Sequence, residues 1–198
     1  IDSKSPCFGT KTNNSETVLD KTLTKIMPAV ILPNILVTGT PGCGKTTTCK
    51  RLAEALNFKH QEVSEIVKAH DFTDGYDEEL ACPFLDEDKL LDYLEPIMQE
   101  GGNIVEYHSN ELFPERWFQL VLVVRCDTQV LFDRLTARGY NQKKIEQNMS
   151  CEIFGTIHEE ALDSYKPEIV HEIRSEKEED FEKTLQLVKD FLEKWKKK

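Results

Sequence analysis

Positive charge is scarce in this sequence: of its 198 residues, 25 are Lys or Arg and 36 are Asp or Glu, for a formal net charge of −11. Sequence-independent binding of nucleic acid takes its affinity mainly from Lys and Arg on phosphates. The acidic balance therefore argues against a nucleic-acid binder, and we expect no direct, sequence-specific binding of nucleic acid either. Basic proteins suit such a surface better as partners.

Long apolar runs are absent as well, since no stretch approaches the length of a transmembrane helix, and we expect no membrane association. Closely spaced cysteine pairs are also missing. The six cysteines show no C-x-x-C spacing, and Cys43 and Cys49 lie in or just after a glycine-rich loop that a disulfide would obstruct. These features predict a reducing compartment, the nucleus or cytoplasm.

The composition that remains, 39% hydrophobic and 31% charged, is typical of a globular protein. We predict a flexible N-terminal tail over residues 1–28, which are rich in Ser, Thr, Asn and Lys. Residues 29–198 suffice for a single α/β domain. No internal repeat is visible.

The most informative stretch is GTPGCGKT at residues 39–46, which fits the phosphate-loop pattern G-x-x-x-x-G-K-[ST]. Residues 35–38 before it are apolar and predict a buried strand. After it, an apolar stripe at i, i+3, i+4 and i+7 predicts a helix: Cys49, Leu52, Ala53 and Leu56. A chance glycine-rich turn is the alternative, but the flanking strand and helix favour nucleotide binding.

This placement has a chemical consequence. Backbone amides at the start of the helix would point at phosphate oxygens of ATP, namely those of Gly42, Gly44, Lys45 and Thr46. The Lys45 ammonium would neutralise the β- and γ-phosphates, and the Thr46 hydroxyl would complete the coordination of Mg²⁺.

Strands alternate with helices along the rest of the chain, which predicts a three-layer α/β fold with a central parallel sheet of about five strands. The expected later strands are residues 58–63, 104–105, 119–125 and 168–173. The expected helices are residues 64–69 capped by Ser64, a helix after Asp86 that Pro96 kinks or ends, a helix from Asp127 or Thr128 to Arg138, residues 142–164, and a helix from Lys177. Residues 71–85 are turn-rich and acidic and predict an irregular loop.

Three further groups are candidate site residues. Glu106 ends a short apolar strand, where such folds place the acid of the Mg²⁺ shell, and His108 follows two residues later. A strand-end histidine with a purely structural hydrogen bond is the alternative for His108. Arg138 at a helix end would contact a transferring phosphoryl group, or merely interact with the helix dipole. Asp74, Gly75 and Tyr76 would cradle a base or ribose, although they are otherwise only a loop.

Family-specific strings accompany the phosphate loop from residue 32 to about residue 173. They are LPNILVTGTPGCGKTT, DGYDEE, CP with LDED, GG followed by EYH, FPERWF, RGYN with KK, and CEIF with SYKPEIV. On these strings the chain resembles the adenylate kinase isoenzyme 6 family, small nuclear adenylate kinases that also act as ATPases in maturation of the small ribosomal subunit.

The resemblance implies roles for particular residues. ATP would be held by Thr47 together with the loop residues, with Arg138 and Lys177 closing over it. Residues 62–85 would form the monophosphate-binding region, including Lys68, and residues 137–147 a short lid. Glu106 and His108 would be the family's acid-x-His pair, serving hydrolysis, with Glu106 holding Mg²⁺ through water. Two departures stand out: Glu106 replaces an Asp, and Lys68 replaces an Arg that would clamp the acceptor phosphate.

The resemblance implies a monomeric kinase that makes two ADP from ATP and AMP, with CMP or dAMP as alternative acceptors. Its implied partner is a basic small-subunit ribosomal protein. The rival interpretation is a conformational ATPase that binds and releases such a protein, with weak kinase activity. A small-metabolite kinase of the shikimate or gluconate type is disfavoured by the family-specific strings.

Overall fold

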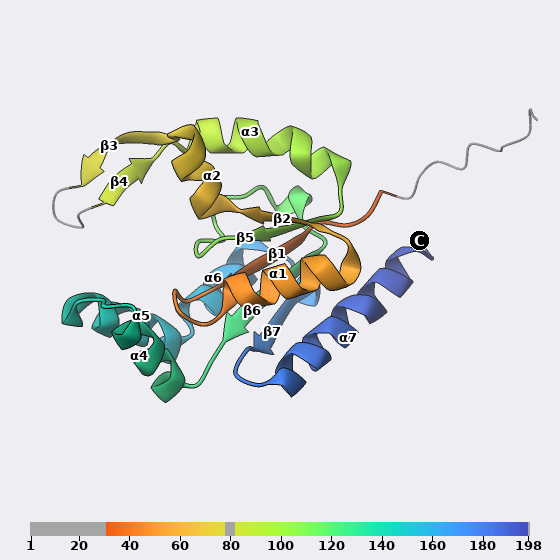
Figure 1. The fold of residues 1–198 in the computed structure, drawn as a ribbon. Helices are drawn as coiled ribbons and strands as arrows, with labels where there is room; N and C mark the ends of the chain where they lie inside the picture. Colours follow the sequence, from red (N-terminus) through yellow and green to blue (C-terminus); the bar gives the residue numbers. More distant parts are fainter. Residues whose placement is uncertain (1–30, 78–81, 198) are drawn as a thin grey trace, which may run out of the picture. The chain divides into compact units, whose positions relative to one another are not determined.

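The computed structural model describes residues 31–77 and 82–197. The predicted tail, residues 1–28, lies outside the described residues. A five-stranded sheet is the centre of the fold, in the order β2-β5-β1-β6-β7 (Figure 1). Every neighbouring pair in it is parallel. The strands are β1 Ile35–Gly39, β2 Lys59–Glu62, β5 Asn103–Glu106, β6 Leu120–Arg125 and β7 Val170–Arg174. The predicted parallel sheet of about five strands is confirmed.

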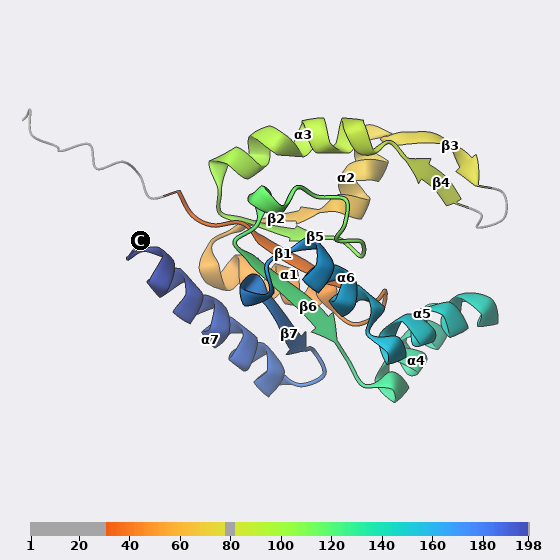
Figure 2. The same cartoon turned by 180° about the vertical axis from the view of Figure 1, so that it is seen from behind.

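Helices cover both faces of this sheet (Figures 1 and 2). They are α1 Lys45–Leu56, α2 Val63–His70, α3 Glu87–Glu100, α4 Thr128–Ala137, α5 Gln142–Phe154, α6 Thr156–Ser164 and α7 Glu178–Trp195. The alternation of side chains along β1 explains the two layers. Ile35 and Val37 belong to one core cluster with α1, α4 and α7, whereas Leu36 belongs to a second cluster with α3 and α6.

The sheet order places the glycine-rich loop at a topological switch point. β1 lies between β5 and β6, so the chain crosses over to both sides of it. Ligands of open parallel sheets bind beyond the carboxyl ends of the strands at such a point. The loop after β1 and Glu106 at the end of β5 both lie there, because Val37 pairs in register with Glu106.

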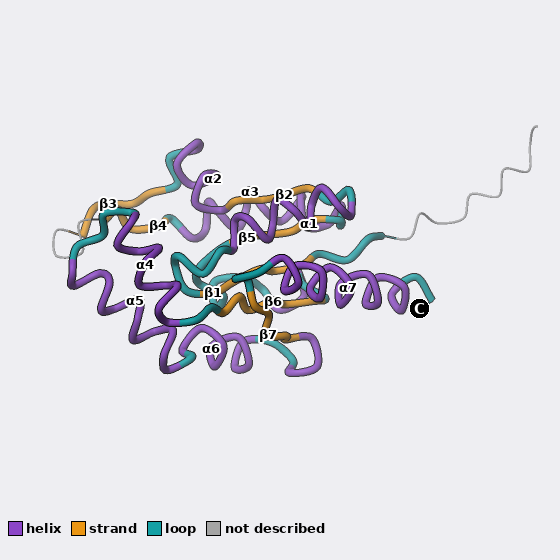
Figure 3. The backbone as a smooth tube through the Cα atoms, turned by 60° about the horizontal axis from the view of Figure 1, so that its bottom comes forward, coloured by secondary structure: helices purple, strands orange, loops and turns teal. Residues whose placement is uncertain are grey.

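The structure corrects the prediction that residues 71–85 form an irregular loop. Strands β3, Thr73–Asp77, and β4, Cys82–Leu85, form an antiparallel pair, with residues 78–81 outside the described part. The register shifts between Thr73 and Tyr76, around Gly75 at φ 84°. The turn-forming and acidic residues of this segment are typical of loops, so its composition did not indicate two strands. Figure 3 shows this hairpin and the α4–α5 pair at the same end of the sheet, where β1 leads into its loop.

The predicted helix over residues 142–164 is wrong in one respect: it is two helices. Gly155 separates α5 from α6 with a left-handed φ of 70° and caps α5. Pro96 does not end its helix either, since α3 continues to Glu100 with Leu90, Leu94 and Met98 buried. Burial of that face outweighs the hydrogen bond that proline removes.

Helix starts were partly predictable. Asp86 accepts from the Lys89 amide at 3.1 Å, and Asp127 accepts from the Gln129 amide at 2.8 Å, so both predicted caps are confirmed. Ser64 is not a cap, because α2 already begins at Val63 with Glu62 as its N-cap. The N-cap therefore lies two residues earlier than predicted, and Val63 in the first turn is buried in the second core cluster. None of the described helices is both long and apolar enough to span a membrane.

Candidate active site

The loop between β1 and α1 is shaped around the Lys45 side chain. Lys45 is buried, and its Nζ donates to the carbonyl oxygens of Gly39 at 2.8 Å and Thr40 at 3.2 Å. Burial lowers the pKa of Lys45 from its ordinary value, although nearby negative groups oppose the shift. Gly42 must be glycine: its φ is 101°, and a Cβ there would lie 2.8 Å from Leu131 Cδ1.

A buried carboxylate, that of Glu152, supports the loop from behind. Its Oε2 accepts from Thr40 Oγ1 at 2.6 Å, and its Oε1 accepts from Arg125 Nε at 2.7 Å and from the Cys126 amide at 3.2 Å. Burial alone would raise the pKa of Glu152, but the hydrogen bonds from Thr40 and Arg125 lower it below its usual value. The sequence reasoning missed this residue. The only indication of Glu152 in the sequence was an acidic residue within the helical segment CEIF.

Arg134 holds the same loop from another side. Its guanidinium donates to the carbonyl oxygens of Cys43 at 3.3 Å and Ser175 at 3.2 Å. Ser175 Oγ donates to the Cys43 carbonyl as well. These contacts hold the carbonyl oxygens away from the site, which leaves the amides free for a ligand.

Glu106 faces the loop from the end of β5. Its Oε1 accepts from Thr46 Oγ1 at 2.5 Å, and its Oε2 lies 2.9 Å from His60 Nε2. Burial would raise the pKa of Glu106, but the hydrogen bonds with His60 and Thr46 lower it. Hydroxyl and carboxylate oxygens are ligands that Mg²⁺ prefers, so these residues fit a magnesium ion. His60 was missed, because only the parallel pairing of β2 with β5 brings it to Glu106.

Two cavities adjoin the loop and share four lining residues, Gly42, Gly44, Thr47 and Arg138. The first, of about 290 Å³, is also lined by Arg51, Arg134, Arg174, Ser175, Lys177 and Phe181. The second, of about 550 Å³, is also lined by Lys45, Thr46, Lys68, Glu106, His108 and Lys144. Arg138 therefore lies where a ligand in either cavity can reach it.

The second cavity collects most of the predicted site residues but not the DGY segment. Asp74 and Gly75 lie exposed on β3 and line neither cavity. The Tyr76 backbone pairs with Pro83, and its side chain lies outside the described part. The hairpin projects from the end of the sheet (Figure 1), and the expectation that these residues cradle a base or ribose stays a prediction.

His108 and Lys68 both line this cavity, and their pKa values are shifted in opposite directions. The centre of the His108 ring lies 4.4 Å from that of the Tyr107 ring, the two planes are tilted by 53°, and His108 is exposed. Desolvation, then the charges of Lys45 and Lys144, lowers the pKa of His108, so the imidazole is neutral at neutral pH. Lys68 is exposed and pairs with Glu65 at 2.7 Å, which raises the pKa of Lys68.

Comparison with known proteins identifies the family of this chain. A Drosophila melanogaster protein named adenylate kinase isoenzyme 6 homolog is 52% identical over 168 residues, which cover 85% of this chain and 96% of that protein. A Caenorhabditis elegans protein of the same name is 50% identical over 158 residues, 79% of this chain and 87% of that protein. The chain belongs to the adenylate kinase isoenzyme 6 family.

A family model and a solved structure give further information on the domain type and the fold. Residues 35–155 match a family model described as an AAA domain. A solved structure of a putative kinase from Chloroflexus aurantiacus has a TM-score of 0.58 at 17% identity, covering 84% of this chain and 98% of that one. At that identity the likeness concerns the fold. Together these findings support a phosphate-loop kinase that binds nucleotide.

Two segments contribute lining residues to the second cavity, and they are the ones for which the sequence predicts a monophosphate-binding region and a lid. Residues 62–85 contain α2 and the β3–β4 hairpin, and they contribute Glu62, Ser64, Glu65 and Lys68 to its lining. Residues 137–147 join α4 to α5 and contribute Arg138, Tyr140 and Lys144. Lys144 Nζ lies 4.7 Å from the centre of the Tyr140 ring, a cation–π contact.

Proposed function

We propose that the protein is an Mg²⁺-ATP-dependent nucleoside monophosphate kinase that converts ATP and AMP to two ADP. The observation that carries this proposal is the pair of cavities that adjoin the phosphate loop, with Arg138 lining both. A kinase needs a donor nucleotide and an acceptor meeting at one phosphoryl group, and two adjoining cavities provide that arrangement. The family relatives named adenylate kinase support the choice of AMP.

The donor nucleotide fits the first cavity and the loop. The Gly42, Gly44 and Thr46 amides would bind phosphate oxygens, and Lys45 would exchange its carbonyl partners for phosphate. Arg51 and Phe181 both line this cavity, and the Arg51 guanidinium lies over the Phe181 ring, 3.7 Å from its centre, so the planar guanidinium offers a surface on which a base can stack. Lys177, the N-cap of α7, lines the same cavity.

Little covalent chemistry is required of the chain. The acceptor phosphate is already ionised at neutral pH, so these residues need only align it with the γ-phosphoryl group and stabilise the charge of the transition state. Lys45 and Arg138 supply the positive charge, and Thr46 and Glu106 would hold Mg²⁺. The magnesium ion, when bound, neutralises charge on the phosphate oxygens. Closure of the segment 137–147 over the cavity would exclude water.

An ATPase activity is the second candidate, and the lining of the acceptor side favours it. Lys68, the basic residue there from α2, already pairs with Glu65, and Glu62 adds a further acid to the same wall. Such a lining would bind an anionic acceptor weakly, because Lys68 is already paired and the acids repel a phosphate. A neutral water molecule is not repelled by these acids. The neutral His108 imidazole could position that water. We also propose, from the family, a role in small-subunit maturation with a basic ribosomal protein, in nucleus and cytoplasm.

The experiment that tests the proposal is quantitative nucleotide analysis after incubation with Mg²⁺-ATP, with and without AMP. A kinase consumes AMP and makes two ADP for each ATP. ADP formation that AMP does not stimulate, with AMP recovered unchanged, would refute the kinase and leave the ATPase.

A further inference from the structure

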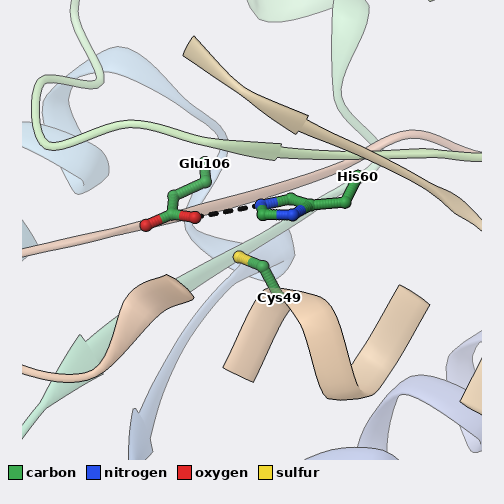
Figure 4. A group of neighbouring side chains, drawn as sticks. All are labelled: Cys49, His60 and Glu106. Atoms are coloured by element: carbon green, nitrogen blue, oxygen red, sulfur yellow. Dashed lines mark hydrogen bonds and ion pairs between the residues drawn. The ribbon is translucent and has the colours of Figure 1, made fainter. Parts of the chain in front are cut away.

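A cluster of three metal-ligating side chains lies beside the phosphate loop, and phosphoryl transfer does not use all of them. Cys49 comes from α1, His60 from β2 and Glu106 from β5, and the three side chains point toward one another (Figure 4). One ligand atom from each, a sulfur, a ring nitrogen and a carboxylate oxygen, lies within 4.8 Å of the other two. Three separate elements therefore bring three different ligand types to one point.

The mixture of ligands is selective. Magnesium and calcium take oxygen ligands, whereas thiolate and imidazole suit zinc and related transition metals. Zinc bonds of about 2.0 to 2.3 Å in a tetrahedron separate the ligand atoms by roughly 3.3 to 3.8 Å. His60 Nε2 and Glu106 Oε2 are already 2.9 Å apart, so small side-chain rotations would open a position for the ion.

The geometry points to a binding site for Zn²⁺, or a transition metal ion of its class, held by Cys49 Sγ, His60 and Glu106 Oε2 with water as the fourth ligand. The site is nearly closed, since Cys49 is fully buried and the His60 and Glu106 side chains are 14% and 8% exposed. The thiol proton leaves to solvent when the ion binds. A thiolate and a carboxylate then balance the two positive charges of the ion.

The ion has a path into the cluster. Glu106 also lines the 550 Å³ cavity, so its carboxylate is reached from there without unfolding of α1. Zinc binding at this carboxylate would also affect turnover. That effect rests on the proposed function, whereas the zinc site itself does not. Glu106 Oε1 meets Thr46, and Oε2 faces the cluster. A zinc ion on Oε2 would draw the carboxylate away from Thr46 and lower Mg²⁺-ATP turnover.

The test uses the full chain without nucleotide. Cobalt(II) serves as a coloured probe, because a bound thiolate gives a charge-transfer absorption, and calorimetry measures Zn²⁺ affinity. The wild-type protein should bind one equivalent and show the thiolate band. Cys49→Ala should lose the band and weaken Zn²⁺ binding at least about 10-fold, as losses around metal sites do. Cys151→Ala, outside the cluster, should behave as wild type.

Two results would overturn the site: equal Zn²⁺ affinity in Cys49→Ala and wild type, or a thiolate band that persists in Cys49→Ala. Loss of the band in Cys126→Ala alone would also overturn it, because the metal would then sit at the Cys43–Cys126 thiols, 3.3 Å apart. If Cys49→Ala does not fold by circular dichroism, His60→Ala takes its place with the same expected weakening.

The effect on turnover has its own test. Zinc should inhibit Mg²⁺-ATP turnover by the wild type but not by Cys49→Ala at equal metal concentration. Zinc binding without inhibition would contradict only the effect on turnover.

Discussion

The Thr46 hydroxyl donates a 2.5 Å hydrogen bond to Glu106, joining the end of the phosphate loop to the end of the neighbouring strand β5. The two residues are far apart in the chain, and the parallel register of β1 with β5 brings them together. The contact brings together two oxygen-bearing side chains of the kind that Mg²⁺ prefers as ligands. It also shows that Glu, in place of the shorter Asp, reaches the hydroxyl directly.

Replacement of Lys45 by Ala should lower turnover by on the order of 10²-fold or more, because the charge that meets the phosphates is lost. Steady-state rates and circular dichroism measure this. Lys50→Ala is the matched control, since Lys50 is exposed on the same helix and its nearest acid, Glu62, is 3.9 Å away. A folded Lys45→Ala protein with near-wild-type turnover would show that the loop is not catalytic.

Arg138→Ala should reduce kcat more than it raises KM for ATP, if the guanidinium meets the γ-phosphoryl group chiefly in the transition state. Arg116→Ala, an exposed arginine paired with Glu95, should leave both constants unchanged. A raised KM with unchanged kcat would instead make Arg138 a residue of simple ATP binding.

His108→Gly should lower ATPase activity measured without AMP by more than it lowers AMP phosphorylation. Hydrolysis needs a positioned water, whereas an ionised acceptor phosphate needs no base. The lowered pKa of His108 keeps the ring neutral at neutral pH, as this role requires. Equal losses of both activities in a folded variant would assign His108 a structural or shared role.

Glu152→Ala should destabilise the protein strongly, by about 3 kcal/mol, because it leaves Arg125 and Thr40 without their buried partner. Glu172→Ala is the matched control: this second carboxylate on Arg125 lies at 3.3 Å and is 40% exposed, so its loss should cost less than about 1 kcal/mol. Denaturant unfolding measures both. Similar costs for the two variants would contradict the supporting role of Glu152.

The same carboxylate predicts a pH dependence. The folded-state pKa of Glu152 lies below its ordinary value of 4.5, so its stabilisation is present above that pH and is lost as the pH falls through the folded pKa. Glu152→Gln should therefore show a smaller loss of unfolding free energy than wild type on acidification. Parallel curves for the two proteins would mean that Glu152 does not carry this dependence.

Local patterns predicted the parts of the site that adjoin one another in sequence. The loop at residues 39–46 and its strand and helix are a continuous signal, and Glu106 was predictable as the acid that ends a strand. Glu152 and His60 were not, because Glu152 reaches Thr40 across 112 residues and His60 reaches Glu106 only through strand pairing. The sequence shows Gly155 but did not predict that the helix ends there, since a glycine can also lie within a helix.

The most direct test of the central claim follows a radiolabelled γ-phosphate from ATP in the presence of AMP and Mg²⁺. Our account predicts that the label appears in ADP, that omission of AMP diverts the remaining slower turnover to inorganic phosphate, and that Lys45→Ala abolishes both. Label released only as inorganic phosphate, whether or not AMP is present, would contradict the claim that these two cavities serve phosphoryl transfer between nucleotides.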